Sequence, residues 1–483
     1  MKESFLEHVK RIRYYNDALA VLYWDLRTGA PRKGAAQRAE VIGMLSAEIY
    51  QLSTSAEMEK YLEYFERPEN NASLDNIMKA VVRECRKEFD KYRKIPADKY
   101  KEYVILTSNA ETVWEDAKNN DDFPLFKPYL EKIVEFNLEF IELWGYEGNK
   151  YNTLLDFNEP GMTVDQLDRI FDELRTRIVP LIAKIGKAPV QPEEGILNRY
   201  FDIAKQEEFS LYILEKMGYD FDAGRLDESE HPFTIGINPG DVRITTHYYP
   251  KDFASALMSS MHEGGHALYE QNISEELNGT PLCTGASDGI HESQSRFWEN
   301  IIGRSRGFWE KYYEDLQKVF PQQLGNVSLD SFHRAINKVE PSLIRVEADE
   351  VTYNLHVMIR YEIEKALINR EIKVADLPEV WKAKMKEYLG VTPSDDRTGV
   401  LQDVHWSGGS FGYFPSYTLG NIYAAQLYNA AKKEIGDFDS LIAKGELATI
   451  KKWLADKVHK HGKLMKPQEL IREITGEGID PRY

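Results

Sequence analysis

Apolar and polar residues in the first part of the chain follow the period of an amphipathic helix. From Phe5 to about Gly186, apolar residues recur at three- and four-residue steps within runs rich in Glu, Lys and Arg, as in "LDNIMKAVVRECRKEFDKYRKI". This spacing predicts helices with one buried and one solvated face. Short segments rich in Pro, Gly, Asn and Asp predict turns between these helices; they are "ERPENNAS", "NNDDFP" and "NEPGM".

The period changes in the middle of the chain. In "HPFTIGINPGDVRITTHYY", residues 231–249, β-branched and aromatic residues flank Asn238–Asp241, which predicts a β-hairpin or a pair of short strands. The helical pattern then returns and continues through residues 292–320 and 343–368. Residues 390–420 form a second irregular stretch, rich in Gly, Ser and aromatic residues, and such long loops are usually functional. The fold is therefore predicted to be mostly α, with a small β element.

Length and composition narrow the class of protein. We expect residues 1–483 to form a single domain, with a Pro/Gly-rich stretch at 186–195 that suggests subdomains 1–190 and 191–483. The formal net charge of −18 argues against nucleic acid or an anionic membrane as the main partner. No stretch approaches the roughly 20 apolar residues of a membrane-spanning helix. The charged N-terminus and the presence of only two cysteines predict a cytoplasmic protein.

The stretch "HEGGHALYEQ" carries the strongest chemical signal. His262 and His266 are four residues apart, so on a helix their imidazoles project from one face in a geometry that chelates zinc. Glu263 occupies the position of the general base in the HExxH arrangement. A catalytic zinc also needs a third protein ligand and an open position. The next helical segment opens with His291 and Glu292, and spacing alone does not separate these two candidates.

Two glycines, Gly264 and Gly265, interrupt this predicted helix. Each costs about 1 kcal/mol relative to alanine in a helix interior. A close crossing by the ligand-bearing helix, or a substrate chain above the site, would explain the loss, because a glycine leaves space for the approach. Alternatively, packing needs only one of the two glycines. The sequence leaves both explanations open.

Further residues could complete a hydrolytic site. The stretch 390–420 supplies His405, Tyr413 and Tyr417, which could donate a hydrogen bond to a tetrahedral oxyanion. Alternatively, the two tyrosines only pack against neighbouring side chains and donate no hydrogen bond to the oxyanion. Asp288 and Asp349 are candidate acceptors for the second N–H group of each ligating histidine.

Two arginines could hold the carboxylate of a peptide C-terminus, since guanidinium binds carboxylate through paired hydrogen bonds. They are Arg243 in the predicted hairpin and Arg345 in an apolar helical stretch. The alternative for Arg345 is a local ion pair with Asp349, four residues further on.

Six strings in order resemble the carboxypeptidase Taq family of metallocarboxypeptidases, over nearly the whole chain. They are "HPF" (231–233), "DVRIT" (241–245), "HEGGHALYEQ" (262–271), "HESQSRFWEN" (291–300), "IRVEAD" (344–349) and "GVLQDVHW" (399–406). Near the N-terminus, "WDLRTGAPRKGAAQRAE" is also similar, although Ala30 stands where the family has methionine.

The resemblance implies metal ligation by His262, His266 and Glu292, with Glu263 as the general base. It further implies a nearly all-helical homodimer with a deep, long groove, closed at one end by segments that include His231. Family members use zinc or cobalt, and this ligand set tolerates both.

The sequence is compatible with three functions. The first is a cytoplasmic, broad-specificity metallocarboxypeptidase that acts on peptides. The second keeps the metal but makes the protein an endopeptidase or an aminopeptidase. The third is a non-catalytic helical scaffold, which would need a fourth protein ligand to close the metal site.

Overall fold

The computed structural model describes residues 1–483, and its first 186 residues are helical as the sequence predicts. The predicted turns separate successive helices, except that "ERPENNAS" also contains a four-residue helix, α4. The bounds are α1 (Lys2–Thr28), α2 (Ala35–Ser53), α3 (Ala56–Glu66), α4 (Pro68–Asn71), α5 (Asn76–Arg93), α6 (Ala97–Asn120), α7 (Phe123–Trp144), α8 (Tyr151–Asn158) and α9 (Val164–Gly186).

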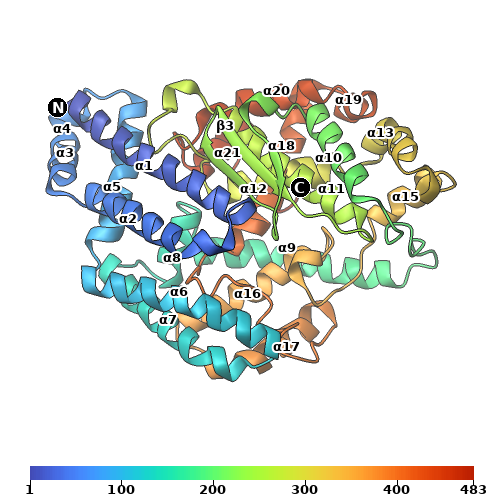
Figure 1. Cartoon of the computed structure of the whole chain (residues 1–483), viewed down its shortest axis with the longest axis horizontal. Coiled ribbons are helices and arrows are strands. Elements are labelled where there is room, and N and C mark those ends of the chain that lie inside the picture. The colour runs from blue at the N-terminus through green and yellow to red at the C-terminus, as the bar shows by residue number, and fades with distance from the viewer.

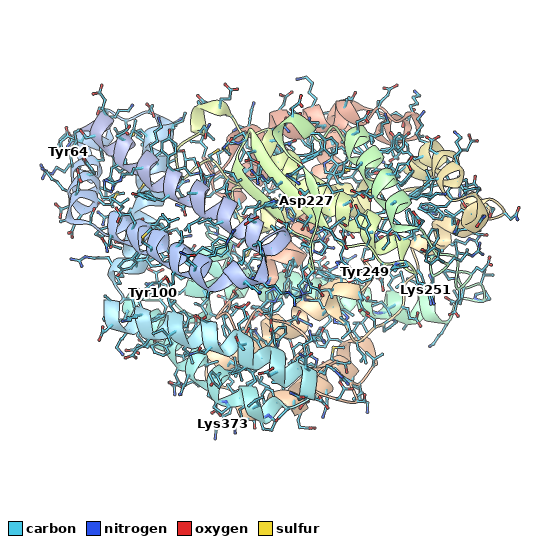
Figure 2. All side chains as sticks on the ribbon, in the orientation of Figure 1. Tyr64, Tyr100, Asp227, Tyr249, Lys251 and Lys373 are labelled. Carbon is cyan, nitrogen blue, oxygen red and sulfur yellow. The ribbon has the colours of Figure 1, made fainter.

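The predicted β element is part of a three-stranded sheet. Strands β2 (Thr234–Asn238) and β3 (Asp241–Thr246) pair antiparallel, as the hairpin pattern indicates. A third strand, β1 (Leu226–Glu228), pairs parallel to β3 and gives the order β1-β3-β2. Asp227 in Figure 2 marks β1. With three residues, this strand is too short to show an alternating pattern, so the sequence did not predict it.

The second half of the chain returns to helices, as expected. Helix α11 packs against β2, β3, α10 and α12, so the sheet lies directly beside the HExxH segment (Figure 1). The bounds are α10 (Ile203–Met217), α11 (Phe253–Gln271), α12 (Asp288–Arg296), α13 (Arg306–Val319), α14 (Pro321–Leu324), α15 (Leu329–Ile336), α16 (Tyr353–Ile368), α17 (Leu377–Leu389), α18 (Pro415–Ile435), α19 (Phe438–Lys444), α20 (Leu447–Lys457) and α21 (Pro467–Thr475).

Three predicted boundaries are wrong. The helix predicted to open at His291 begins at Asp288, because Ser287 caps it. The helical stretch predicted from 343 begins only at Tyr353, because Asp349 accepts hydrogen bonds from the backbone N–H groups of Val351 and Thr352 and so forms a turn before α16. The irregular stretch predicted up to residue 420 ends at Pro415, a residue that favours the first turn of a helix. Tyr417 therefore lies on α18, not on a loop.

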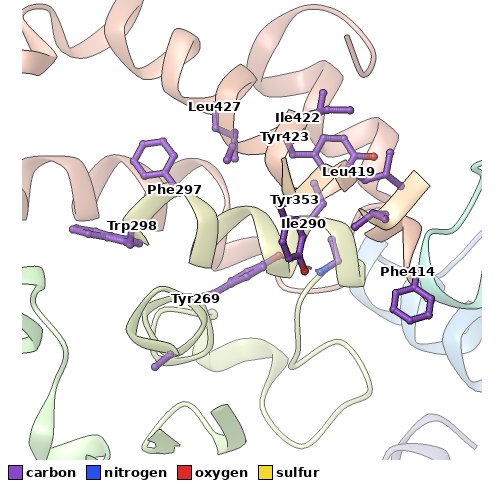
Figure 3. Close-up of a cluster of buried hydrophobic side chains, with 14 of the residues drawn as sticks. Tyr269, Ile290, Phe297, Trp298, Tyr353, Phe414, Leu419, Ile422, Tyr423 and Leu427 are labelled. Atoms are coloured by element: carbon purple, nitrogen blue, oxygen red, sulfur yellow. Dashed lines mark hydrogen bonds between the residues drawn. The ribbon is translucent and has the colours of Figure 1, made fainter. Parts of the chain in front are cut away.

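Buried apolar side chains from both halves of the chain form one contiguous core. It includes the interface of α12 with α18, where Ile290 lies near Leu419 and Tyr423, while Phe297, directly after α12, lies near Leu427 (Figure 3). The mostly α fold with a small sheet is confirmed, whereas the subdomain boundary near residue 190 stays a prediction. No helix is long and apolar enough to cross a membrane.

Candidate metal centre

His262 and His266 project from the same face of α11 toward Glu292 on α12. The Nε2 atoms of His262 and His266 lie 3.6 and 3.4 Å from Oε2 of Glu292, and the three ligand atoms are all within 4.8 Å of one another. Ligands about 2.0–2.1 Å from a tetrahedral metal are about 3.3 Å apart, so this donor set fits a zinc-sized ion. The side chains of the two histidines are 19% and 16% exposed, which leaves the face between them open to solvent.

The two glycines of α11 serve different neighbours. A Cβ atom on Gly265 would lie 2.5 Å from the carbonyl oxygen of Gln294, in the backbone of α12. A Cβ atom on Gly264 would lie 2.6 Å from a methyl carbon of Leu214 on α10. Both glycines are thus used in packing, and Gly265 is the one that lets the helix carrying Glu292 approach the histidines. The close-crossing explanation holds for Gly265.

Glu292 is held in place from several sides. Arg296 donates a hydrogen bond to its Oε1 atom over 2.6 Å, and the hydroxyl of Ser295 donates to Oε2 over 3.1 Å. Burial opposes the charge, but Arg296 and His262 outweigh it and hold the pKa of Glu292 well below its usual range. On the other side Gly420 of α18 approaches so closely that its Cβ atom would lie 2.5 Å from Cγ of Glu292. The carboxylate is therefore ionised and oriented toward the histidines.

His262 and His266 each use the second ring nitrogen for a hydrogen bond. Nδ1 of His262 lies 2.8 Å from Oε2 of Glu299, in the π-helical segment Phe297–Ile302 that follows α12. Nδ1 of His266 lies 2.6 Å from Nδ1 of His291, whose Nε2 atom is 2.8 Å from Glu270. His291 thus has both nitrogens engaged behind His266, which favours Glu292 as the third ligand.

The predicted acceptors for these N–H groups were wrong. Asp349 receives hydrogen bonds from Thr352 and Glu340 instead, and the observed partner of His262 is Glu299. Asp288 is the first residue of α12, one turn before Glu292, and has no hydrogen bond to His262 or His266.

Glu263 lies beside the three predicted ligands and is 7% exposed. Thr234, the first residue of β2, donates its hydroxyl to Oε2 of Glu263 over 2.6 Å. Burial raises the pKa of Glu263, while the charge of His262 and the Thr234 hydrogen bond oppose the rise. The sheet therefore orients this glutamate, and a raised pKa suits a group that takes up and releases a proton.

A second cluster joins three of the predicted residues. Nε2 of His405 lies 3.2 Å from the hydroxyl of Tyr417, and the rings of Tyr413 and Tyr417 meet edge to face at 5.3 Å. Burial lowers the pKa of His405 to about 4, and Asp403 only partly offsets this, so the imidazole is neutral at pH 7. Tyr417 precedes Gly420 by one helical turn on α18, so the cluster lies next to Glu292.

Arg345 belongs to this second cluster, but its partner is not the predicted one. Its Nε and NH2 atoms donate to Asp403 over 3.0 and 2.8 Å, and its NH1 atom donates to Tyr353 over 2.9 Å. The local pair with Asp349 is absent because Arg345 lies in a 3-10 turn (Arg345–Glu347), not in a helix. Fully buried Arg360 donates to the other oxygen of Asp403 over 2.6 Å. One carboxylate therefore faces two buried arginines.

The remaining predicted residues lie on the sheet side. Arg243 donates two hydrogen bonds of 2.7 Å to Asp241 and has its guanidinium 5.8 Å from the ring of Trp24 on α1. His231 is exposed, and its carbonyl accepts a hydrogen bond from Ser229.

Several residues that shape the site were not predicted. Arg296 and Glu299 follow Glu292 by four and seven residues, a helical spacing that could have indicated a shared face. Thr234 and Asp403 gave no such signal, because they reach the site through the sheet and through contacts across the fold.

The chain matches known proteins along its whole length. The family model described as carboxypeptidase Taq (M32) metallopeptidase matches residues 4–483. "Carboxypeptidase 1" of Bacillus subtilis (strain 168) is 50% identical over 482 residues, which cover 100% of this chain and 96% of that protein. "Thermostable carboxypeptidase 1" of Thermus thermophilus is 42% identical, covering 99% of this chain and 96% of that protein.

The fold is also similar to those of solved carboxypeptidase structures. A structure of Pyrococcus furiosus carboxypeptidase superposes with a TM-score of 0.96 at 38% identity, covering 100% of this chain and 96% of that one. The chain therefore belongs to the carboxypeptidase Taq (M32) family of metallopeptidases.

Proposed function

We propose that this protein is a metal-dependent carboxypeptidase that releases single residues from the C-termini of peptides with broad specificity. The observation that carries the proposal is the convergence of His262, His266 and Glu292 with Glu263 beside them. Three protein ligands leave the open position that a catalytic zinc requires. His291, the nearest further donor, has both ring nitrogens engaged, which argues against a closed structural site.

The chain's own residues divide the chemistry between them. When bound, a divalent ion supplies Lewis-acid chemistry that acidifies water and polarises the scissile carbonyl. Glu263 takes the proton of the attacking water and passes it to the nitrogen of the leaving amine. His405, with Tyr413 and Tyr417, donates hydrogen bonds to the oxyanion. We propose zinc as the ion, with cobalt as the alternative.

Arg345 is the better supported of the two arginines for binding the substrate carboxylate. It shares Asp403 with Arg360, and its guanidinium carbon lies 5.0 Å from the ring of Tyr417, beside the proposed oxyanion donors. Both arginines have a carboxylate partner, but Arg243 pairs with Asp241 in the sheet and has no contact with His405, Tyr413 or Tyr417. Arg243 and His231 would then contact the substrate further along the groove, next to the sheet.

The test compares one unstructured peptide with a free and with an amidated C-terminus. Metal-loaded protein should shorten only the free peptide, one residue at a time, as read by mass spectrometry. Glu263→Gln should keep the metal and lose activity by about 10²–10⁴-fold, because the general base is missing. Internal cuts in both peptides would favour the endopeptidase, and shortening from the N-terminus would favour the aminopeptidase. Retained activity in Glu263→Gln would contradict the role of this residue.

The homodimer, the deep groove and the cytoplasmic location stay predictions. Sedimentation of the purified protein would test the dimer, and fractionation of cells that produce the protein would test the location.

A further inference from the structure

Glu364 of α16 is a fully buried carboxylate with three hydrogen-bond donors around it. The hydroxyl of Tyr151 donates to Oε2 over 2.6 Å, the backbone N–H of Gly412 donates to the same atom over 2.9 Å, and the indole N–H of Trp406 donates to Oε1 over 2.7 Å. Nothing in the proposed chemistry uses this group directly. Burial raises the pKa of this carboxyl to about 7, because its three hydrogen bonds offset the loss of solvation only in part.

Trp406 and Gly412 lie just inside the two ends of the segment that carries His405 and Tyr413, two of the three proposed oxyanion donors. Trp406 directly follows His405, and Gly412 directly precedes Tyr413. We refer to residues 404–413 as the oxyanion loop. Glu364 therefore holds the chain at both ends of this loop, one residue away from each of the two side chains.

Other contacts leave the loop little freedom at these points. Gly412 has a φ of +85°, and a Cβ atom there would lie 2.6 Å from the carbonyl oxygen of Leu154, so only glycine fits. The ring of Trp406 stacks on Phe411 at 6.2 Å and meets Trp381 edge to face at 6.0 Å. Before the loop, Asp403 is fixed by Arg345 and Arg360.

The partners also explain why the residue is a glutamate. An indole N–H and a backbone N–H can only donate, and a carboxylate offers acceptors on both oxygens. A glutamine in the same place would turn an NH2 group toward at least one of these donors. That bond would be lost, and a buried N–H group would be left unpaired.

We propose that Glu364 is a positioning residue for catalysis: by accepting hydrogen bonds from Trp406 and Gly412 it fixes where the oxyanion loop presents His405 and Tyr413. The proposal rests on the proposed roles of those two residues. Glu364 would therefore act on catalysis by holding the oxyanion loop, and not by stabilising α16.

The experiment compares Glu364→Gln with Tyr151→Phe and Glu362→Gln. Tyr151→Phe removes a hydrogen bond from the same carboxylate but leaves both loop contacts in place. Glu362→Gln changes the glutamate two residues before Glu364 on α16. This side chain pairs with Lys384 and Tyr388, away from the loop. All proteins are metal-loaded, and metal content, kcat, KM and hydrogen–deuterium exchange of residues 404–413 are measured.

Glu364→Gln should bind metal as the wild type does and exchange faster in the oxyanion loop. Its kcat should fall by about 10- to 100-fold with a smaller change in KM, because the displaced groups act after the substrate is bound. The two matched variants should keep wild-type exchange in the loop and kcat within about threefold of the wild type. Unchanged loop exchange in Glu364→Gln, or an equal loss of kcat in Tyr151→Phe, would overturn the proposal. Faster loop exchange with unchanged kcat would instead refute the catalytic roles of His405 and Tyr413, and with them the positioning role.

Discussion

The Nδ1–H group of His262 donates a hydrogen bond to Oε2 of Glu299 over 2.8 Å, so a carboxylate stands directly behind one of the proposed metal ligands. Glu299 is itself paired with Arg296, which also holds Glu292. Burial opposes the charge on Glu299, but Arg296 and His262 together lower its pKa to about 2, so it is ionised at neutral pH. Arg296 thus orients both Glu292, a proposed ligand, and Glu299, which holds the proposed ligand His262.

Glu299→Gln should weaken metal binding by about 10- to 100-fold, the usual effect of removing the hydrogen-bond partner of a ligating histidine. An amide accepts a weaker hydrogen bond than a carboxylate does, so the imidazole of His262 is less well oriented. Competition with a chelator measures the metal Kd. The control is Glu310→Gln, since Glu310 is exposed on α13 and pairs only with Arg306. Equal Kd values for the two variants would contradict this prediction.

Gly265→Ala and Gly43→Ala should change stability in opposite directions. An added Cβ at Gly265 meets the α12 backbone at 2.5 Å, whereas at Gly43, inside α2, nothing lies within 4 Å. We expect the first substitution to destabilise the fold by about 1–3 kcal/mol through overpacking and to weaken metal binding by displacing Glu292. The second should stabilise by about 0.4–1 kcal/mol. Urea unfolding measures both, and a neutral Gly265→Ala would show that α12 can move away without cost.

The sequence predicted those parts of the site that lie within one helix or one turn. The spacing of His262 and His266 on a helix is a local property, and the hairpin around Asn238–Asp241 is local too. Asp403 could not be found in this way, because it joins Arg345 and Arg360 across 58 and 43 residues of chain. Only packing brings such residues together.

The identity of the third ligand likewise depends on packing between helices, which the sequence pattern does not report. The sequence placed Glu292 at the start of a helix, whereas α12 begins at Asp288 and Glu292 lies in its second turn. The choice between Glu292 and His291 depends on the direction from which each side chain meets His266: Glu292 faces the Nε2 atom, and His291 lies against Nδ1. That direction is set by the close approach at Gly265 and Gly420, which no periodicity reports.

Arg345→Gln should raise KM for peptides with a free C-terminus by about 10- to 100-fold, the equivalent of losing a charged hydrogen bond to the substrate. Arg243→Gln should change KM by much less, because Arg243 lies in β3 and not beside Tyr417 as Arg345 does. Arg345→Lys keeps the charge without the two-bond geometry and should fall between them. Thermal melting shows whether the fold survives the loss of the hydrogen bonds between Arg345 and Asp403. A larger effect of Arg243→Gln would exchange the two assignments.

His356 of α16 should make the fold sensitive to acid. It is fully buried, and neither of its ring nitrogens has a hydrogen-bond partner. Burial, together with the positive charge of Arg360, lowers its pKa from 6.5 to about 3. Between these two values the unfolded chain binds a proton that the folded protein does not, so stability falls as pH falls through this window.

This histidine should cost the wild type about 2 kcal/mol between pH 7 and pH 5, at about 1.4 kcal/mol per pH unit once the unfolded chain is fully protonated. His356→Leu removes the titrating group, so its stability should decline less steeply, by about one proton. Urea midpoints measured at half-unit steps from pH 7 to pH 5 test this. The other histidines contribute equally to both proteins, so the difference in slope isolates His356. Parallel curves would mean that the imidazole is protonated in the folded protein, with a partner such as Asp403.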